Sequence, residues 1–227
     1  MEIQIRHNPS FSVARCLLGA SEPLKVEAGA MVAWAPDVTI ESKAEGGVMK
    51  SLKRAALGGE SFFMTTAHAG PSGGWADVAP VLPGDIGTMT IDPSRAFFIQ
   101  KGSWLASEAG VNIETQWGGM KNLFGGEGGF LVRAEGQGQV LFSCYGALDR
   151  MTLQPGQTVV VDTGHMVAFD ETVSMELTKA ASGLIKSVKS GEGLVFRFTG
   201  PGELLMQTRS PNVFIDWLTT SLPFSRS

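Results

Sequence analysis

Residues Gly29–Glu41 have the sequence Gly-Ala-Met-Val-Ala-Trp-Ala-Pro-Asp-Val-Thr-Ile-Glu, and the chain repeats this stretch twice more without a gap. The second copy is Gly102–Glu114 (Gly-Ser-Trp-Leu-Ala-Ser-Glu-Ala-Gly-Val-Asn-Ile-Glu), and the third is Gly164–Glu176 (Gly-His-Met-Val-Ala-Phe-Asp-Glu-Thr-Val-Ser-Met-Glu). Each copy opens on glycine, has alanine at its fifth position and closes on glutamate. Apolar and polar residues alternate toward the end of the first copy, which predicts a strand with one buried face.

The repeated register extends well beyond these copies and defines a unit of roughly 65–70 residues, longer than common solenoid repeats. We expect one all-β domain spanning residues 1–227, a β-sandwich or prism of three repeats at approximately 1–78, 79–145 and 146–209. One such unit cannot bury its apolar face alone. Closing three units around a pseudo-threefold axis would leave no long exposed sheet edge, so this arrangement is the expected one.

The end of the chain breaks from the repeat. Ser210 and Pro211 have the residue types favoured at the cap and the first position of a helix. Phe214, Trp217 and Leu218 share one face of the helix that follows. The sequence therefore predicts a short closing helix over residues 210–222 that lies as a lid on the β core.

Composition narrows the class of protein. The 227 residues carry a net charge of −4, which gives no reason to expect nonspecific binding to nucleic acid. No apolar run has the length of a signal peptide or a transmembrane helix, so we expect the protein to lie in the cytoplasm, with a peripheral membrane location as the alternative.

Cys16 and Cys144 are expected to be reduced, buried structural thiols. The three histidines lack the short spacing of metal ligands, so no metal or cofactor is predicted.

Three carboxylates occupy the same place in every copy, namely Glu41, Glu114 and Glu176. If the fold brought them together, they would repel one another, shift their pKa values or bind a cation. If each lies on the polar face of its strand, they face solvent, as the alternation already predicts. The second interpretation is the favoured one.

A basic segment bounded by glycines follows each copy, at residues 46–58, 118–126 and 183–191. Each combines apolar residues with positive charge. The basic residues are Lys50, Lys53, Arg54, Lys121, Lys186 and Lys189. We expect threefold closure to gather them on one rim, where they could bind an anionic membrane surface or an acidic partner. The alternative is that their apolar residues cap the core while the lysines are solvated.

The chain resembles the altered-inheritance-of-mitochondria family over essentially its whole length. Three stretches carry this resemblance: Lys-Ser-Leu-Lys-Arg at 50–54, Gly-Gly-Glu-Ser-Phe-Phe at 58–63 and Arg-Ser-Pro…Phe-x-x-Trp-Leu at 209–218. The resemblance implies a fold like that of the tryptophan RNA-binding attenuation protein, a β-sandwich of short strands in a homo-oligomer. For mitochondrial members it implies a role in inner-membrane organisation. It implies no agreed activity, cofactor or catalytic residue.

We therefore expect a non-enzymatic, homo-oligomeric β-scaffold that binds a partner protein or a membrane surface through the rim, with a trimer as one possible assembly. Apolar residues that one domain cannot readily bury also favour assembly. They are Trp75, Val78, Val81, Leu82, Phe97 and Phe98. The alternative is a small-ligand-binding protein or an enzyme using a cleft between repeats. Single-stranded nucleic-acid binding is weaker still, because the acidic chain lacks a basic groove interleaved with aromatic residues.

Overall fold

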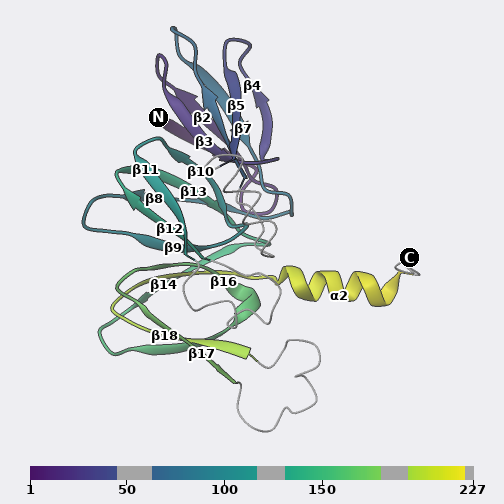
Figure 1. The fold of residues 1–227 in the computed structure, drawn as a ribbon. Helices are drawn as coiled ribbons and strands as arrows, with labels where there is room; N and C mark the ends of the chain where they lie inside the picture. Colours follow the sequence, from purple (N-terminus) through teal and green to yellow (C-terminus); the bar gives the residue numbers. More distant parts are fainter. Residues whose placement is uncertain (45–62, 117–130, 180–193, 223–227) are drawn as a thin grey trace.

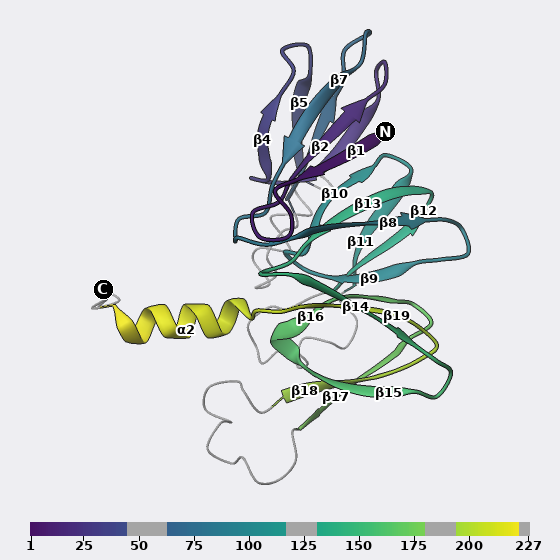
Figure 2. The same cartoon turned by 180° about the vertical axis from the view of Figure 1, so that it is seen from behind.

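The computed structural model describes residues 1–44, 63–116, 131–179 and 194–222. Within these ranges the protein is built of antiparallel strands, with one short C-terminal helix, so the all-β expectation is confirmed. The strands stack in three tiers that follow the order of the sequence (Figures 1 and 2).

The strands of the first tier are β1 (Glu2–Arg6), β2 (Val13–Leu18), β3 (Pro23–Glu27), β4 (Met31–Trp34), β5 (Thr39–Ala44), β6 (Phe63–His68) and β7 (Gly74–Val78). Those of the second tier are β8 (Ile86–Ile91), β9 (Phe97–Gln100), β10 (Trp104–Glu108), β11 (Val111–Gln116), β12 (Leu131–Gly136) and β13 (Gly138–Ser143). The third tier contains β14 (Leu148–Leu153), β15 (Thr158–Asp162), the 3-10 turn η2 (Thr163–His165), β16 (Met166–Asp170), β17 (Ser174–Lys179), β18 (Leu194–Thr199) and β19 (Gly202–Gln207).

The three tiers share one strand order. One half of each tier has the order β2-β7-β4, β8-β13-β10 or β14-β19-β16, and the other half has β5-β6-β3, β11-β12-β9 or β17-β18-β15. Halves of adjacent tiers join edge to edge, because β3 pairs with β10 and β9 pairs with β16. In the described part of the chain, β4 and β15 are left as sheet ends, so the expected closure around an axis is not observed there.

The stretch that repeats in the sequence takes a similar course each time. A β-bulge lies between Met31 and Ala33 on β4, and the corresponding strands β10 and β16 have a bulge at the same place. Gly29 and Gly102 precede their strands with φ of 90° and 82°. Gly164 instead lies in η2, because the side chain of Asp162 accepts a hydrogen bond of 2.9 Å from its N–H.

The core runs through the stack as three clusters of buried apolar residues. Trp104 and Phe97 are among its largest fully buried side chains. Cys16 and Cys144 are buried free cysteines, as predicted, and burial raises their thiol pKa values to about 12 and about 11. Of the apolar residues singled out in the sequence, Phe97 is buried whereas Val81 is 91% exposed.

The C-terminal helix is present as α2 (Pro211–Ser221), with proline in its first turn. Ser210 occupies the cap position but makes no side-chain capping hydrogen bond. The prediction that the helix covers the β core is wrong. None of its residues is buried, and it projects from the stack of sheets in both views (Figures 1 and 2). The sheets already bury their inner faces against one another, so the core does not need this helix as a lid.

Candidate functional site

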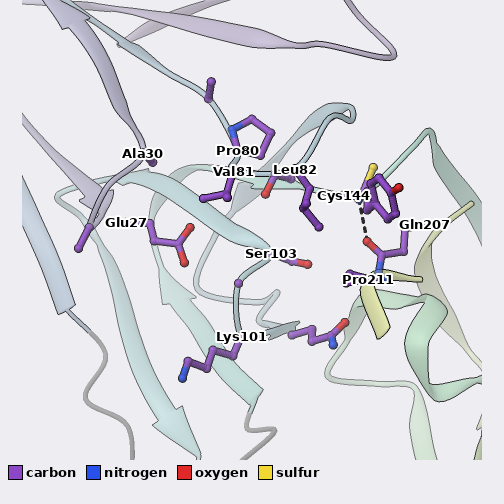
Figure 3. Close-up of a pocket in the computed structure, with 16 residues that line it drawn as sticks. Glu27, Ala30, Pro80, Val81, Leu82, Lys101, Ser103, Cys144, Gln207 and Pro211 are labelled. Carbon is purple, nitrogen blue, oxygen red and sulfur yellow. Dashed lines mark hydrogen bonds between the residues drawn. The ribbon is translucent and has the colours of Figure 1, made fainter. Parts of the chain in front are cut away.

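A cavity of about 360 Å³ lies where the first tier meets the second (Figure 3). Its walls come from distant parts of the sequence: the end of β3, the segment after β7, the turn before β10 and the end of β13. Gln207 and Pro211 extend the lining to the start of α2. The cavity therefore lies at the joint between tiers and is lined by segments that are far apart in the sequence.

Glu27 is the acid of this cavity, and its side chain faces the space between the labelled loops (Figure 3). Burial raises the pKa of its carboxyl to about 7, against the opposing effect of the positive charge on Lys101. Near neutral pH the carboxyl is therefore divided between its acid and its carboxylate, and it can donate as well as accept a hydrogen bond. This property depends on the joint between tiers, which no local sequence pattern indicates.

The two glutamine side chains that line the cavity differ in their hydrogen bonds. The side chain of Gln207 accepts a hydrogen bond from the Tyr145 N–H at 2.8 Å and donates one to the Gly164 carbonyl at 2.9 Å. In contrast, the Oε1 atom of Gln100 is buried and has no hydrogen-bond partner among the described residues. A buried acceptor without a partner costs free energy, and Gln100 is one of the residues that line the cavity.

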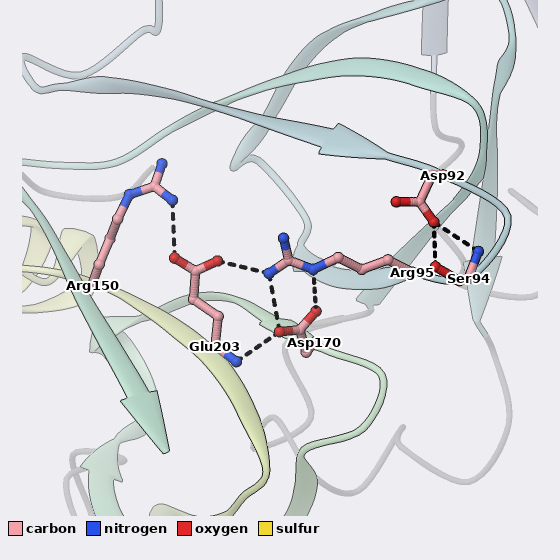
Figure 4. Close-up of polar contacts among 6 residues, drawn as sticks. All are labelled: Asp92, Ser94, Arg95, Arg150, Asp170 and Glu203. Carbon is pink, nitrogen blue, oxygen red and sulfur yellow. Dashed lines mark hydrogen bonds and ion pairs between the residues drawn. The ribbon is translucent and has the colours of Figure 1, made fainter. Parts of the chain in front are cut away.

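A second polar cluster joins the second and third tiers (Figure 4). Arg95 binds Asp170 through two hydrogen bonds of 2.9 Å and 3.2 Å and donates another of 2.9 Å to Glu203. Glu203 also accepts from Arg150 at 3.1 Å, and its own N–H donates to Asp170 at 2.7 Å. Each carboxylate of this cluster is paired, and the ion pairs of Arg95 with Asp170 and Glu203 connect the two tiers.

The six basic residues of the predicted rim, Lys50, Lys53, Arg54, Lys121, Lys186 and Lys189, all lie outside the described residues. The strands that flank them are described. The basic segments connect β5 to β6, β11 to β12 and β17 to β18, which are antiparallel neighbours in every case. These three hairpins hold the same place in the strand order of their tiers.

The three repeated carboxylates are exposed and lie in three different sheets, Glu41 on β5, Glu114 on β11 and Glu176 on β17. Glu41 lies 3.5 Å from the His68 ring, and Glu114 accepts a hydrogen bond of 3.1 Å from Asn112. Across the described ranges, no three acidic, histidine or cysteine side chains gather as a metal site would require. The placement agrees with the solvent-facing interpretation.

The sequence predicted the helix α2 but did not predict that its apolar side chains are exposed to solvent. Val213, Ile215 and Trp217 are exposed, and Trp217 reaches 60%. Phe214 provides aromatic contacts on both sides, with ring centroids 5.7 Å from Tyr145 and 6.2 Å from Trp217. The signal that could have revealed this surface is the composition of the helix, in which Val213 and Ile215 widen the apolar face beyond Phe214, Trp217 and Leu218. The helix has a single charged residue, Asp216. No helix in the described ranges is both long enough and apolar enough to cross a bilayer.

Comparisons with known proteins cover nearly all of the chain. The family model described as mitochondrial biogenesis AIM24 matches residues 3–209. A Streptococcus pyogenes protein described as uncharacterized is 28% identical over 233 residues, which cover 99% of this chain and 92% of the relative. A Streptococcus pyogenes protein solved by X-ray crystallography in a structural genomics programme superposes with a TM-score of 0.81 at 26% identity, covering 97% of this chain and 99% of that chain.

Proposed function

This chain belongs to the mitochondrial biogenesis AIM24 family, and we propose that it is a non-enzymatic scaffold that assembles with copies of itself and binds an anionic membrane surface. The exposed apolar helix α2 is the observation that carries this proposal. It projects from the stack of sheets with Val213, Ile215 and Trp217 open to solvent (Figures 1 and 2).

The apolar face of a helix is normally buried against other parts of the protein, yet no residue of α2 is buried in the single chain. Covering an exposed side chain of this size stabilises a complex by about 1.5–3 kcal/mol. Several such side chains on one helix therefore favour a partner surface. The 11 residues of α2 are too few to span a bilayer, for which about 20 are needed. The helix can instead lie in the membrane interface, where the amphipathic ring of tryptophan is favoured.

The basic segments at 46–58, 118–126 and 183–191 would supply the electrostatic part of the attraction. Each lysine or arginine near an anionic surface contributes about 1 kcal/mol. The whole chain has a net charge of −4, so attraction to an anionic surface must come from a local concentration of positive charge. The equivalent places of the three hairpins in their tiers support such a concentration.

The finer description of the fold belongs to the same proposal. We propose that the three tiers are copies of one unit, in a repeat similar to that of the tryptophan RNA-binding attenuation protein fold. The gap-free register of Gly29, Gly102 and Gly164 supports it, as does the strand order that the tiers share. A scaffold built in this way presents the same surface segment several times, which strengthens binding to an extended partner.

Vesicle co-sedimentation tests the proposal. Wild type should sediment with anionic vesicles, remain in solution with neutral ones, and be released by salt, because charges are screened over roughly 8 Å at physiological ionic strength. One variant replaces the six rim residues with serine, and a second replaces Val213, Ile215 and Trp217 with serine; both should lose binding. Ile40→Ser, at a 38% exposed apolar position on β5 in the first tier, is the matched control and should bind like wild type. Absence of wild-type binding at low salt would contradict the proposal and point to a protein partner.

The unpaired Gln100 Oε1 favours a second candidate function, the binding of a small molecule in the cavity beside Glu27. Native mass spectrometry of the purified protein tests it. A retained small molecule should add mass to wild type, and Glu27→Leu, which removes the carboxyl from the cavity, should lose that mass. Identical spectra for the two proteins would remove this candidate.

A further inference from the structure

Two sheet ends of this chain correspond to strands that are paired elsewhere in the same chain. Inside the molecule, β10 pairs with β3 and β16 pairs with β9, and these pairings join one tier to the next. By the repeated register, β4 is the counterpart of β10 and β16, and β15 is the counterpart of β3 and β9. In the described part of the chain, β4 and β15 are sheet ends.

Side chains are more buried on the strands of the joints than on β4 and β15, each of which is paired along one edge only. All five residues of β16 are buried, and so are four of the five in β10. On β4, the counterpart of these two strands, no residue is buried. On β15 only Val161 is buried, against two residues in each of its counterparts β3 and β9. Trp34 on β4 is 45% exposed, and Val160 on β15 is 52% exposed. An exposed edge strand with apolar side chains is a template for pairing with a strand of another chain, and proteins commonly protect such edge strands with charged residues.

The two joints within the chain specify the register in which β4 and β15 would pair. Ala106 lies opposite Val26 in the first joint, and Ala168 lies opposite Ile99 in the second. The same register places Ala33 of β4 opposite Val161 of β15. Trp34 then lies opposite Val160, so that the two exposed apolar side chains are direct cross-strand neighbours.

Charge does not oppose this pairing. Strand β4 has no charged residue, and β15 has only Asp162 at its end. Among the other sheet ends, β1, β5, β14 and β17 carry two charged residues each, β11 carries one and β8 carries none. The two strands that correspond to joint strands therefore carry less charge than most of the other sheet ends, with β8 as the exception.

The two ends cannot meet within one molecule in this arrangement. The strand β4 lies in the first tier and β15 in the third, with the second tier between them in both views (Figures 1 and 2). We infer that β15 of one copy pairs antiparallel with β4 of a second copy, in the register Ala33–Val161 and Trp34–Val160. The pairing continues the sheet across the molecular boundary as β9 and β16 continue it within the chain.

This inference deepens the assembly part of the proposed function by naming its surface and its partner, a second copy of this chain. The contact uses two different patches, so it is head-to-tail. Such contacts generate a closed ring if the rotation between copies closes and an open filament if it does not. Membrane binding through α2 uses other residues, so vesicle binding and strand pairing can fail independently of each other.

Cysteine cross-linking tests the inference with purified full-length protein. Trp34→Cys and Val160→Cys are made in separate chains, mixed and oxidised with copper phenanthroline. The mixture should form a cross-linked dimer and nothing larger, because each chain carries one half of the joint. Neither variant alone should cross-link. A chain with both substitutions should give a ladder of larger species or a closed ring.

The matched control uses Ile40→Cys in place of the Trp34→Cys variant. Ile40 is exposed on β5, and the counterparts of β5, which are β11 and β17, are sheet ends as well. Mixed with Val160→Cys, it should give no dimer. All three positions are exposed, so the variants should melt close to wild type, which is verified by circular dichroism. The inference is overturned if Trp34→Cys cross-links to itself as well as to Val160→Cys, or if the mixture of folded variants gives no dimer.

Discussion

The ring of Phe169 on β16 lies 5.4 Å, centroid to centroid, from the ring of Phe98 on β9. These residues face each other across the joint between the second and third tiers. Their counterparts in the repeated register are Trp34 on one sheet end and Val160 on another. This joint thus shows how an apolar cross-strand pair seals the second tier against the third, whereas the equivalent pair in the first joint is Ser107 and Lys25. The two sheet ends carry the residues for an apolar pair like that of the second joint.

The ion cluster of the second joint should contribute measurably to stability. Asp170 is 8% exposed and accepts two hydrogen bonds from Arg95 and one from the N–H of Glu203. Asp170→Ala should lower the free energy of unfolding by about 2 kcal/mol, because it leaves charged donors without their acceptor. Glu171→Ala, which breaks the exposed pair with Arg133, should cost less than about 1 kcal/mol. Urea denaturation of both variants compares the two losses, and equal losses would contradict the assignment.

Stability should depend on pH through Glu27. Its folded-state pKa is raised from 4.5 to about 7, so between these values the folded protein binds the proton more tightly than the unfolded chain does. The resulting stabilisation is complete below the unfolded value and is lost as the pH rises through the folded value. At about 1.4 kcal/mol per pKa unit the loss has an upper limit of about 3 kcal/mol, which solvent access to the half-buried side chain reduces.

Glu27→Gln should flatten this dependence. Melting temperatures measured from about pH 5 to about pH 8 should fall less for the variant than for wild type. Glu114→Gln, at an exposed position on β11, is the matched control and should follow wild type. Parallel curves for Glu27→Gln and wild type would show that the carboxyl of Glu27 is not desolvated in the cavity.

Gly84 should tolerate no side chain. A Cβ atom at this position would lie 1.8 Å from the carbonyl oxygen of Cys144, which is backbone and cannot move aside cheaply. Gly84→Ala should therefore destabilise the protein by about 3 kcal/mol or more. Gly102→Ala, where φ is 82° but no atom lies within 4 Å of the added Cβ, should cost only about 1–2 kcal/mol. Thermal denaturation ranks the two variants, and the reverse order would contradict the close approach of Gly84 to the backbone of Cys144.

The two thiols should be unreactive in the folded protein. Burial raises the pKa of Cys16 to about 12 and that of Cys144 to about 11, so little thiolate forms near neutral pH. A chromogenic disulfide reagent at about pH 8 should label neither cysteine in buffer and both in guanidinium chloride. Rapid labelling in buffer would show that at least one thiol is accessible and ionised.

The local architecture could be predicted from the sequence because its signals are local. Alternation from Glu2 to Arg6 predicted the strand that forms there, and Pro211 predicted the start of α2. Gly29 and Gly102 precede matching strands in the same left-handed conformation. Gly164 departs from them because the side chain of Asp162, two residues earlier, binds its N–H.

The candidate site was less accessible to prediction because its properties arise from contacts between tiers. Glu27, Gln100 and Tyr145 become neighbours of one cavity only when β3 pairs with β10. The exposure of α2 was missed for a related reason: an apolar helical face indicates that something covers it, but not which surface does. The repeated carboxylates could be assigned to solvent in advance, because strand alternation alone determines which way they face.

Light scattering coupled to size exclusion, at micromolar protein, tests most directly the claim that this chain is a self-assembling scaffold. Wild type should elute with a mass that is a multiple of 24.1 kDa. Trp34→Lys and Val160→Lys, which place a charge on either face of the inferred joint, should each reduce the mass to that of the monomer, while Ile40→Lys should leave it unchanged. A wild-type protein that elutes as a monomer, or an assembly that survives both joint substitutions, would contradict the account.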